Sequence, residues 1–168
     1  LFEAFLDGKQ TFGRNYKLVE DIRLVEDSYG SLLKMALALS RVIERKTAAD
    51  EIVGVLTPNA APTLGLILGL SMRRRVPALL NYTAGAEGLR AACTAANIRH
   101  IIASRTFVEK ARLGPVIEQL DGLTIHYLED FKAEIGLADK LWTLWHMAFP
   151  ASAAVAQTPD DAAIVLFT

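Results

Sequence analysis

The apolar and polar positions along the chain follow two spacings, one typical of strands and one typical of helices. Short runs rich in β-branched and aliphatic residues stand at 52–56, 76–80, 100–103 and 124–128. Between them lie longer stretches whose apolar residues recur every three to four positions. Repeated strand, crossover helix and strand predicts an α/β fold with a mostly parallel sheet and helices on both faces.

The helical stretches have recognisable starts and breaks. We expect helices over about 28–46, 60–74, 86–96 and 131–147. Ser28 is suited to cap the first of them, because its hydroxyl can accept a hydrogen bond from a backbone N–H of the first turn. Thr106 and Glu109 have the capping-box spacing for a further helix, which Gly114-Pro115 interrupts.

Two extended segments lie outside this alternation. Residues 17–25 predict an extended piece or a hairpin through Glu20 and Asp21. Near the other end, residues 164–167 form an unbroken apolar run, which predicts a fully buried strand. No glycine, proline or polar tail closes this run, so we expect the chain to be a piece of something longer.

Composition adds limits to this picture. The chain has 168 residues, of which 52% are hydrophobic and 22% charged, and it fits one folded domain. A net charge of -1 lacks the basic excess that nucleic-acid binding requires. The longest strongly apolar stretch, 61–72, is shorter than the roughly 18 to 20 residues of a membrane-spanning helix. We therefore expect a soluble segment with no nucleic-acid partner and no transmembrane helix.

The side chains of common enzyme chemistries do not stand in the required patterns. The three histidines are far apart, and Cys93 lies in an alanine-rich stretch without a nucleophile motif. The loop after the strand at 52–56 lacks the glycines of a dinucleotide-binding fingerprint. Glu129 and Asp130 follow a strand, and we expect them to cap the next helix rather than to form an acid–base pair. The sequence therefore predicts no catalytic residue and no metal ligand.

Two clusters are candidates for contacts with a partner. Arg73, Arg74 and Arg75 present three guanidinium groups suited to phosphate or to an acidic partner. Alternatively they close a helix, whose carbonyl end favours cations. Trp142 and Trp145 lie in an apolar helical stretch that suits a membrane surface or an acyl chain. At helical spacing they equally suit a core, and both alternatives stay open.

Several stretches, taken in order, resemble a known family. They are VEDSYGSLLKMALALSRVI, IVGVLTPNAAPTLGLILGLSMRRRVPALLN and the closing DDAAIVLFT. They resemble the opening portion of the adenylate-forming (AMP-binding) superfamily of acyl- and aryl-CoA synthetases, luciferases and adenylation domains. The segments RRRVPALLNYTAG, YLEDFKA and ADKLW are most similar to the acyl-[acyl-carrier-protein] synthetase half of the bifunctional 2-acylglycerophosphoethanolamine acyltransferase of Gram-negative bacteria.

This resemblance implies that 1–168 is the N-terminal part of an AMP-binding domain. The parent enzyme would activate a fatty acid with ATP and Mg²⁺ as an acyl adenylate. It would pass the acyl group to acyl carrier protein for lysophospholipid reacylation at the cytoplasmic side of the bacterial inner membrane. Thr168 matches the first residue of the family's ATP phosphate loop, and the acyl pocket and C-terminal domain come later in family members. The chain alone is expected to be inactive and to bind ATP poorly.

A second hypothesis comes from another class of protein. The chain would be a stand-alone α/β binding module that docks an acidic carrier protein or a membrane surface through the arginine cluster or the tryptophan face. It predicts salt-sensitive binding that is lost when Arg73, Arg74 and Arg75 are replaced by alanine. Sequence beyond Thr168 reading Ser-Gly-x-x-Gly followed by Lys would favour the enzyme instead.

Overall fold

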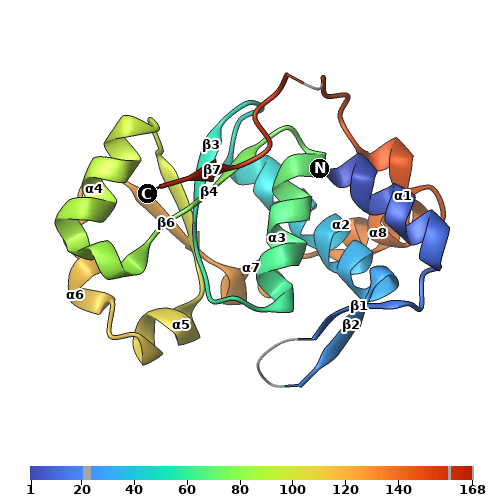
Figure 1. The fold of residues 1–168 in the computed structure, drawn as a ribbon, viewed down its shortest axis with the longest axis horizontal. Helices are drawn as coiled ribbons and strands as arrows, with labels where there is room; N and C mark the ends of the chain where they lie inside the picture. The colour runs from blue at the N-terminus through green and yellow to red at the C-terminus, as the bar shows by residue number, and fades with distance from the viewer. Residues whose placement is uncertain (21–23, 159, 168) are drawn as a thin grey trace.

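A five-stranded parallel sheet forms the centre of the molecule in the computed structural model, which describes residues 1–20, 24–158 and 160–167 (Figure 1). The strand order is β6-β5-β3-β4-β7, and all neighbouring pairs are parallel. The strands are β3 (Ile52–Leu56), β4 (Val76–Leu79), β5 (His100–Ala103), β6 (Thr124–Tyr127) and β7 (Val165–Leu166). The predicted α/β fold with a parallel sheet is confirmed, and the first four of these strands lie within one residue of their predicted bounds.

Helices cover both faces of the sheet, as predicted. They are α1 (Phe2–Phe12), α2 (Tyr29–Lys46), α3 (Ala61–Met72), α4 (Gly85–Ala95), α5 (Arg105–Lys110), α6 (Gly114–Ile117), α7 (Leu128–Glu134) and α8 (Leu137–Ala148), with 3-10 turns η1 (Tyr82–Ala84) and η2 (Pro150–Ala153). Helices α4, α5 and α6 lie on one side of the sheet, and α2, α3 and α7 lie on the other (Figure 1). Helices α1 and α8 pack outside α3 and α2, so that side has an additional layer.

Strand β3 contributes side chains to the hydrophobic cores on both faces of the sheet, because successive side chains of a strand point to opposite faces. Val53 and Val55 pack with residues of α2, α3 and α7, whereas Leu56 packs with residues of α4 and α5. Gly54 lies where side chains of the core come close to the backbone of β3. A Cβ there would stand 2.9 Å from Ile101 Cγ1 and 3.0 Å from Leu80 Cδ1, so a larger residue would have to displace these core side chains.

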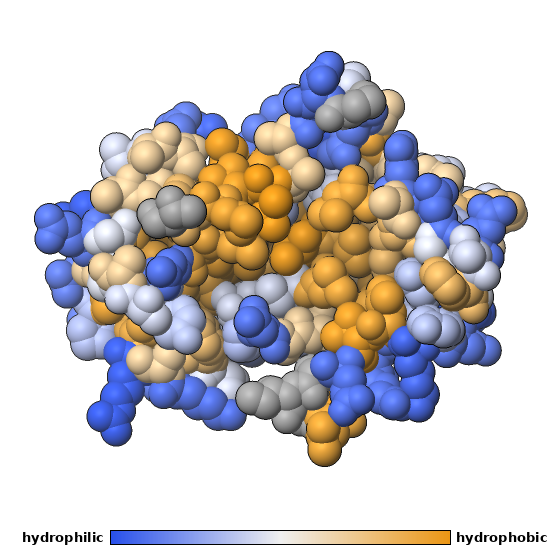
Figure 2. Space-filling model, viewed as in Figure 1, coloured by the Kyte–Doolittle hydropathy of each residue, from blue (hydrophilic) through white to orange (hydrophobic). Residues whose placement is uncertain are grey.

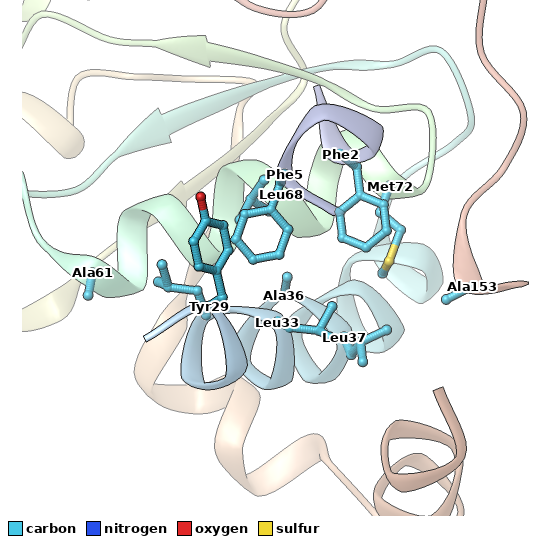
Figure 3. Close-up of a cluster of buried hydrophobic side chains, with 11 residues drawn as sticks. Phe2, Phe5, Tyr29, Leu33, Ala36, Leu37, Ala61, Leu68, Met72 and Ala153 are labelled. Carbon is cyan, nitrogen blue, oxygen red and sulfur yellow. The ribbon is translucent and has the colours of Figure 1, made fainter. Parts of the chain in front are cut away.

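The outer layer begins with α1, which the sequence analysis missed. Phe2 and Phe5 insert their rings between α2 and α3 (Figure 3), where Phe5 lies 5.3 Å from the ring of Tyr29. The residue before the helix, Leu1, supplies no side-chain cap, and the helix contains Gly8, so its own sequence favours helix only weakly. Burial of its aromatic residues stabilises it instead.

The predicted hairpin and the first helix cap agree with the structure. Strands β1 (Lys17–Glu20) and β2 (Glu26–Ser28) pair antiparallel, while the predicted turn at Asp21 lies outside the described residues. The Ser28 hydroxyl accepts a hydrogen bond from the backbone N–H of Ser31 at 3.2 Å. Helix α2 therefore starts where the sequence predicted.

The prediction of one helix over 131–147 was wrong, because the chain breaks between α7 and α8 at Gly136. The Gly136 N–H donates to Asp139 Oδ2 at 3.1 Å, and Asp139 Oδ1 accepts from Arg41 at 3.3 Å and Arg45 at 3.0 Å. Burial works against the charge of Asp139, but these donors outweigh it and lower its pKa. The break thus places a buried carboxylate between two arginines of α2.

The predicted capping box of Thr106 and Glu109 was also wrong. Ser104 is the N-cap of α5, and its hydroxyl accepts from the backbone N–H of Phe107 at 3.3 Å. Strand β5 ends at Ala103, so the helix starts at once and Thr106 already lies inside it. The predicted interruption occurs, but before Gly114-Pro115: α5 ends at Lys110, and Gly114 begins a separate α6 with Pro115 in its first turn.

The closing apolar run is a strand, but it is not buried as predicted. Strand β7 pairs with β4 at the edge of the sheet, and Ile164 is 38% exposed and Leu166 65% exposed. Apolar residues gather on this face, over β7 and α3 (Figure 2). Within the described part of the chain, no element lies beyond β7 to cover it.

Candidate functional site

A cavity of about 440 Å³ lies at the carboxyl ends of β3, β5 and β6. The loop after β3 and the start of α3 form one wall, and α5 and α7 form the others. In open parallel sheets, ligands bind outside the carboxyl ends of the strands. A cavity of this size is also large enough for a small organic molecule.

Hydroxyl groups line the wall beneath α3. Thr63 Oγ1 donates to the carbonyl of Pro58 at 2.6 Å and lies 2.9 Å from Thr57 Oγ1. Helix α3 begins after Ala60, which makes no side-chain cap, and Asn59 beside it is exposed. A second cavity of about 330 Å³ shares Asn59, Ala60 and Thr63, so the start of α3 separates two hollows.

Glu129 is anchored by the neighbouring helix. Its carboxylate accepts from the Ser104 hydroxyl at 2.9 Å and from the backbone N–H groups of Arg105 at 2.9 Å and Thr106 at 3.3 Å. Burial works against its charge, but these donors lower the pKa of Glu129 below its ordinary value. The prediction that Glu129 caps the next helix, α7, was wrong. Glu129 lies in the first turn of α7, but its carboxylate accepts hydrogen bonds from the first backbone N–H groups of α5. Asp130 pairs with Arg105 at 2.8 Å.

Two lysines that the sequence analysis did not single out line this cavity. Lys110 of α5 and Lys132 of α7 are exposed, and neither has an ion-pair partner among the described residues. Phe107 and Leu128 supply apolar wall, and the Phe107 ring meets Tyr82 edge-on at 5.1 Å. The lysines lie in helices, away from the strand ends that sequence reasoning can locate, so no local motif marked them.

The predicted arginine cluster makes contacts inside the molecule. Arg74 holds both oxygens of Asp50 at 2.9 Å. Arg75 is only 7% exposed and donates to Thr47 Oγ1 at 3.1 Å and to the carbonyls of Thr47 and Arg73. Burial lowers the pKa of Arg75 from its ordinary value.

Arg73 meets one of the predicted tryptophans. It pairs with Glu44, donates to the carbonyl of Ala153 at 2.8 Å, and lies 6.0 Å from the ring of Trp142. Arg41 covers the same ring at 4.9 Å. The structure thus brings Arg73 and Trp142 together, and a role for either in contacting a partner stays a prediction.

Trp145 differs from Trp142 in exposure. It is 63% exposed and lies on a face of α8 with Leu141, Leu144 and Phe149, all of them exposed. Among the described helices, none has both the length and the apolar character needed to cross a membrane. Thr168, the predicted start of a phosphate loop, lies outside the described residues.

At the amino end of the sheet, ionisable groups meet. His100 Nδ1 lies 2.6 Å from Glu51 Oε1, and the rings of His100 and His126 are 5.4 Å apart. Burial, and then the charges of Lys46 and His100, lower the pKa of His126. Its Nε2 atom is buried without a hydrogen-bond partner. Across the described ranges, no three His, Cys, Asp or Glu residues come together as a metal site.

Solved structures match the chain over almost its whole length. No family model matches it. VinN, in complex with 3-methylaspartate, is 23% identical with a TM-score of 0.74, over 98% of this chain and 42% of VinN. The N-terminal subdomain of Klebsiella oxytoca NpsA is 15% identical with a TM-score of 0.71, over 100% of this chain and 38% of the NpsA chain. Apo MatB from Rhodopseudomonas palustris is 18% identical with a TM-score of 0.70, over 99% of this chain and 32% of MatB.

These matches show the fold. The parallel sheet with helices on both faces is the fold of the N-terminal subdomain of NpsA and of the matching part of MatB. The chain spans between 32% and 42% of the length of these three structures. A MatB chimera is described as bound to ATP, and NpsA has been solved with 3-hydroxyanthranilyl-AMSN.

Proposed function

We propose that this chain is the N-terminal part of the AMP-binding domain of an ATP-dependent acyl-activating ligase. The specific form of the proposal is an acyl-acyl-carrier-protein synthetase that uses Mg²⁺ and a fatty acid. It would supply acyl groups for lysophospholipid reacylation at the inner membrane. The chain by itself would not catalyse the activation of a fatty acid.

The observation that carries the proposal is the fold match together with the order of the family-like segments. The segment 52–59 forms β3 and the turn after it, and 76–81 forms β4 beside β3. The segment 160–167 includes β7, which pairs with β4. Three segments chosen from sequence alone therefore lie in three adjacent strands, which supports a common origin with the adenylate-forming fold.

In the resembled family, a glycine-rich loop after the strand that matches β7 would hold the phosphates of ATP with backbone N–H groups and a cation. After β7, the described chain continues only to Phe167. ATP would supply the adenylyl group in the longer protein.

Fatty-acid-dependent exchange of pyrophosphate into ATP tests the proposal on the longer protein encoded by the gene. We expect exchange with a fatty acid and Mg²⁺, and none with the 168-residue chain under the same conditions. Transfer to acyl carrier protein, followed as a mass increase of the carrier, tests the acceptor. Exchange supported by amino or aryl acids but not by fatty acids would contradict the substrate class.

The exposed face of α8 favours a second candidate, a binding module that lies on a membrane surface. Leu137, Leu141, Leu144, Trp145 and Phe149 are each between 55% and 74% exposed. A helix with aromatic and leucine residues on one face binds at the lipid–water boundary in proportion to the apolar area that it buries. Docking of an acidic carrier by Arg73, Arg74 and Arg75 has less support, because these side chains have partners within the molecule.

Co-sedimentation of the chain with phospholipid vesicles tests this second candidate. Replacing Leu144 and Trp145 by alanine should weaken binding about tenfold, because the buried apolar area falls. Phe12→Ala, which removes another exposed aromatic residue on α1, is the matched control. Equal loss in the control, or no binding by the unaltered chain, would remove this candidate.

A further inference from the structure

The cavity at the carboxyl ends of β3, β5 and β6 carries two lysines for which the described residues supply no ion-pair partner. Lys110 and Lys132 reach it from two different helices, and both are exposed. Arg105, which lies between the lining residues Ser104 and Thr106, is paired with Asp130. Lysines at a shared cavity repel each other, so a protein gains stability when an anion binds between them.

Glu129, which also lines the cavity, forms no ion pair with Lys110 or Lys132 among the described contacts. The oxygens of Glu129 already accept hydrogen bonds from the Ser104 hydroxyl and from the N–H groups of Arg105 and Thr106. These bonds hold Glu129 against the start of α5. Its role is therefore structural, and the lysine charges remain available to a ligand.

The remaining wall of the cavity is largely apolar. Phe107, Leu128, Pro58 and Pro62 line it. A volume of about 440 Å³ is within the range of small-molecule sites, which combine apolar walls with a few placed polar groups. The ligand that fits this lining has an organic body and a strongly negative end.

We propose that this cavity binds a phosphate monoester, with the phosphate between Lys110 and Lys132 and the organic part against Phe107 and Leu128. A phosphate monoester carries about -1.5 to -2 charges at pH 7, which matches two ammonium groups. A carboxylate carries one charge and pairs best with the planar fork of arginine, which this cavity does not offer. The inference does not depend on the ligase proposal, because binding is a property of this chain.

Isothermal titration calorimetry at low salt tests the proposal with three probes: inorganic phosphate, AMP and 4′-phosphopantetheine. We expect saturable binding of at least one probe, weakened about tenfold or more in Lys110→Ala/Lys132→Ala. The matched control is Lys34→Ala/Lys140→Ala, which removes two exposed lysines of α2 and α8 and should leave binding within about twofold. Circular dichroism verifies that both variants fold.

The probes also identify the source of the phosphate. Preference for AMP indicates a nucleotide, preference for 4′-phosphopantetheine indicates a carrier arm, and equal binding indicates free phosphate; each supports the site when it depends on both lysines. Adenosine and pantetheine, which lack phosphate, should bind at least about tenfold more weakly. Equal loss in the control variant, or no saturable binding by any probe, would overturn the proposal. Neither result affects the ligase proposal, which is measured on the longer protein with a fatty acid.

Discussion

The two ends of the central sheet use charge in opposite ways. At the amino end, Arg75 donates to Thr47 and to backbone carbonyls, and Glu51 meets His100 at 2.6 Å. At the carboxyl end, Lys110 and Lys132 line a cavity without a carboxylate partner among the described residues. Paired and buried polar groups hold the chain in one arrangement, whereas unpaired ones at a cavity are available to a ligand. The difference separates a stabilising end from a binding end.

The largest effect should come from Arg75 at the amino end. Arg75→Met leaves the carbonyls of Thr47 and Arg73 without their donor, and we expect a loss of about 2 to 4 kcal/mol in the free energy of unfolding. Urea unfolding measures it. The control is Arg74→Met, whose ion pair with Asp50 is exposed and contributes about 1 kcal/mol or less. Equal losses in the two variants would contradict the comparison.

Glu129 gives the next largest effect, because it is the structural carboxylate of the carboxyl end. Glu129→Ala removes acceptors for the first N–H groups of α5, and loss of such a cap costs about 1 kcal/mol. Asp130→Ala breaks only an exposed pair with Arg105 and should cost about 0.5 kcal/mol or less. Thermal unfolding of the two variants decides the order, and a larger loss for Asp130→Ala would contradict it.

His126 makes the amino end sensitive to acid. Its pKa is lowered in the folded protein by burial and then by Lys46 and His100. As the pH falls through the ordinary value of about 6.5, the unfolded chain therefore takes up the proton first and the folded state loses stability. His126→Phe should flatten the fall in unfolding free energy between about pH 7 and pH 5. An unchanged pH dependence in this variant would show that other groups are responsible.

The smallest effect should come from the lysines of the cavity. Lys110→Ala/Lys132→Ala removes two exposed charges that have no partner in the described chain, so stability should stay within about 0.5 kcal/mol. Thermal unfolding without added phosphate measures this. A loss as large as that of Arg75→Met would mean that both ends are structural and would break the comparison.

Much of the fold could be predicted because its signals are local. Apolar runs such as 52–56 and helical spacing such as that of α2 lie within a few residues of each other, and Ser28 caps α2 as expected. Errors arose where a distant group decided the outcome. Gly136 breaks a helix because Asp139 meets Arg41 and Arg45 far away in the chain.

The candidate site was less predictable than the fold. The sequence named Glu129 and the loop after β3, but it interpreted Glu129 as a cap of the next helix and found no dinucleotide-binding fingerprint in the loop. Lys110 and Lys132 carry no motif, since each is an ordinary helix residue until α5 and α7 lie on either side of one cavity. The arginine run was conspicuous in the sequence, yet its side chains diverge to Glu44, Asp50 and Thr47.

By itself, the sequence determined the alternation of strands and helices, and with it the parallel α/β class, because periodicity and turn residues act over short distances. Only the tertiary structure decided which polar groups are paired and which are free. Arg75 became a buried donor, and Lys110 a cation without an ion-pair partner in the described chain, because of what packs beside them, and packing partners are separated along the chain. It likewise decided that the closing run, 164–167, is an edge strand with its apolar side uncovered.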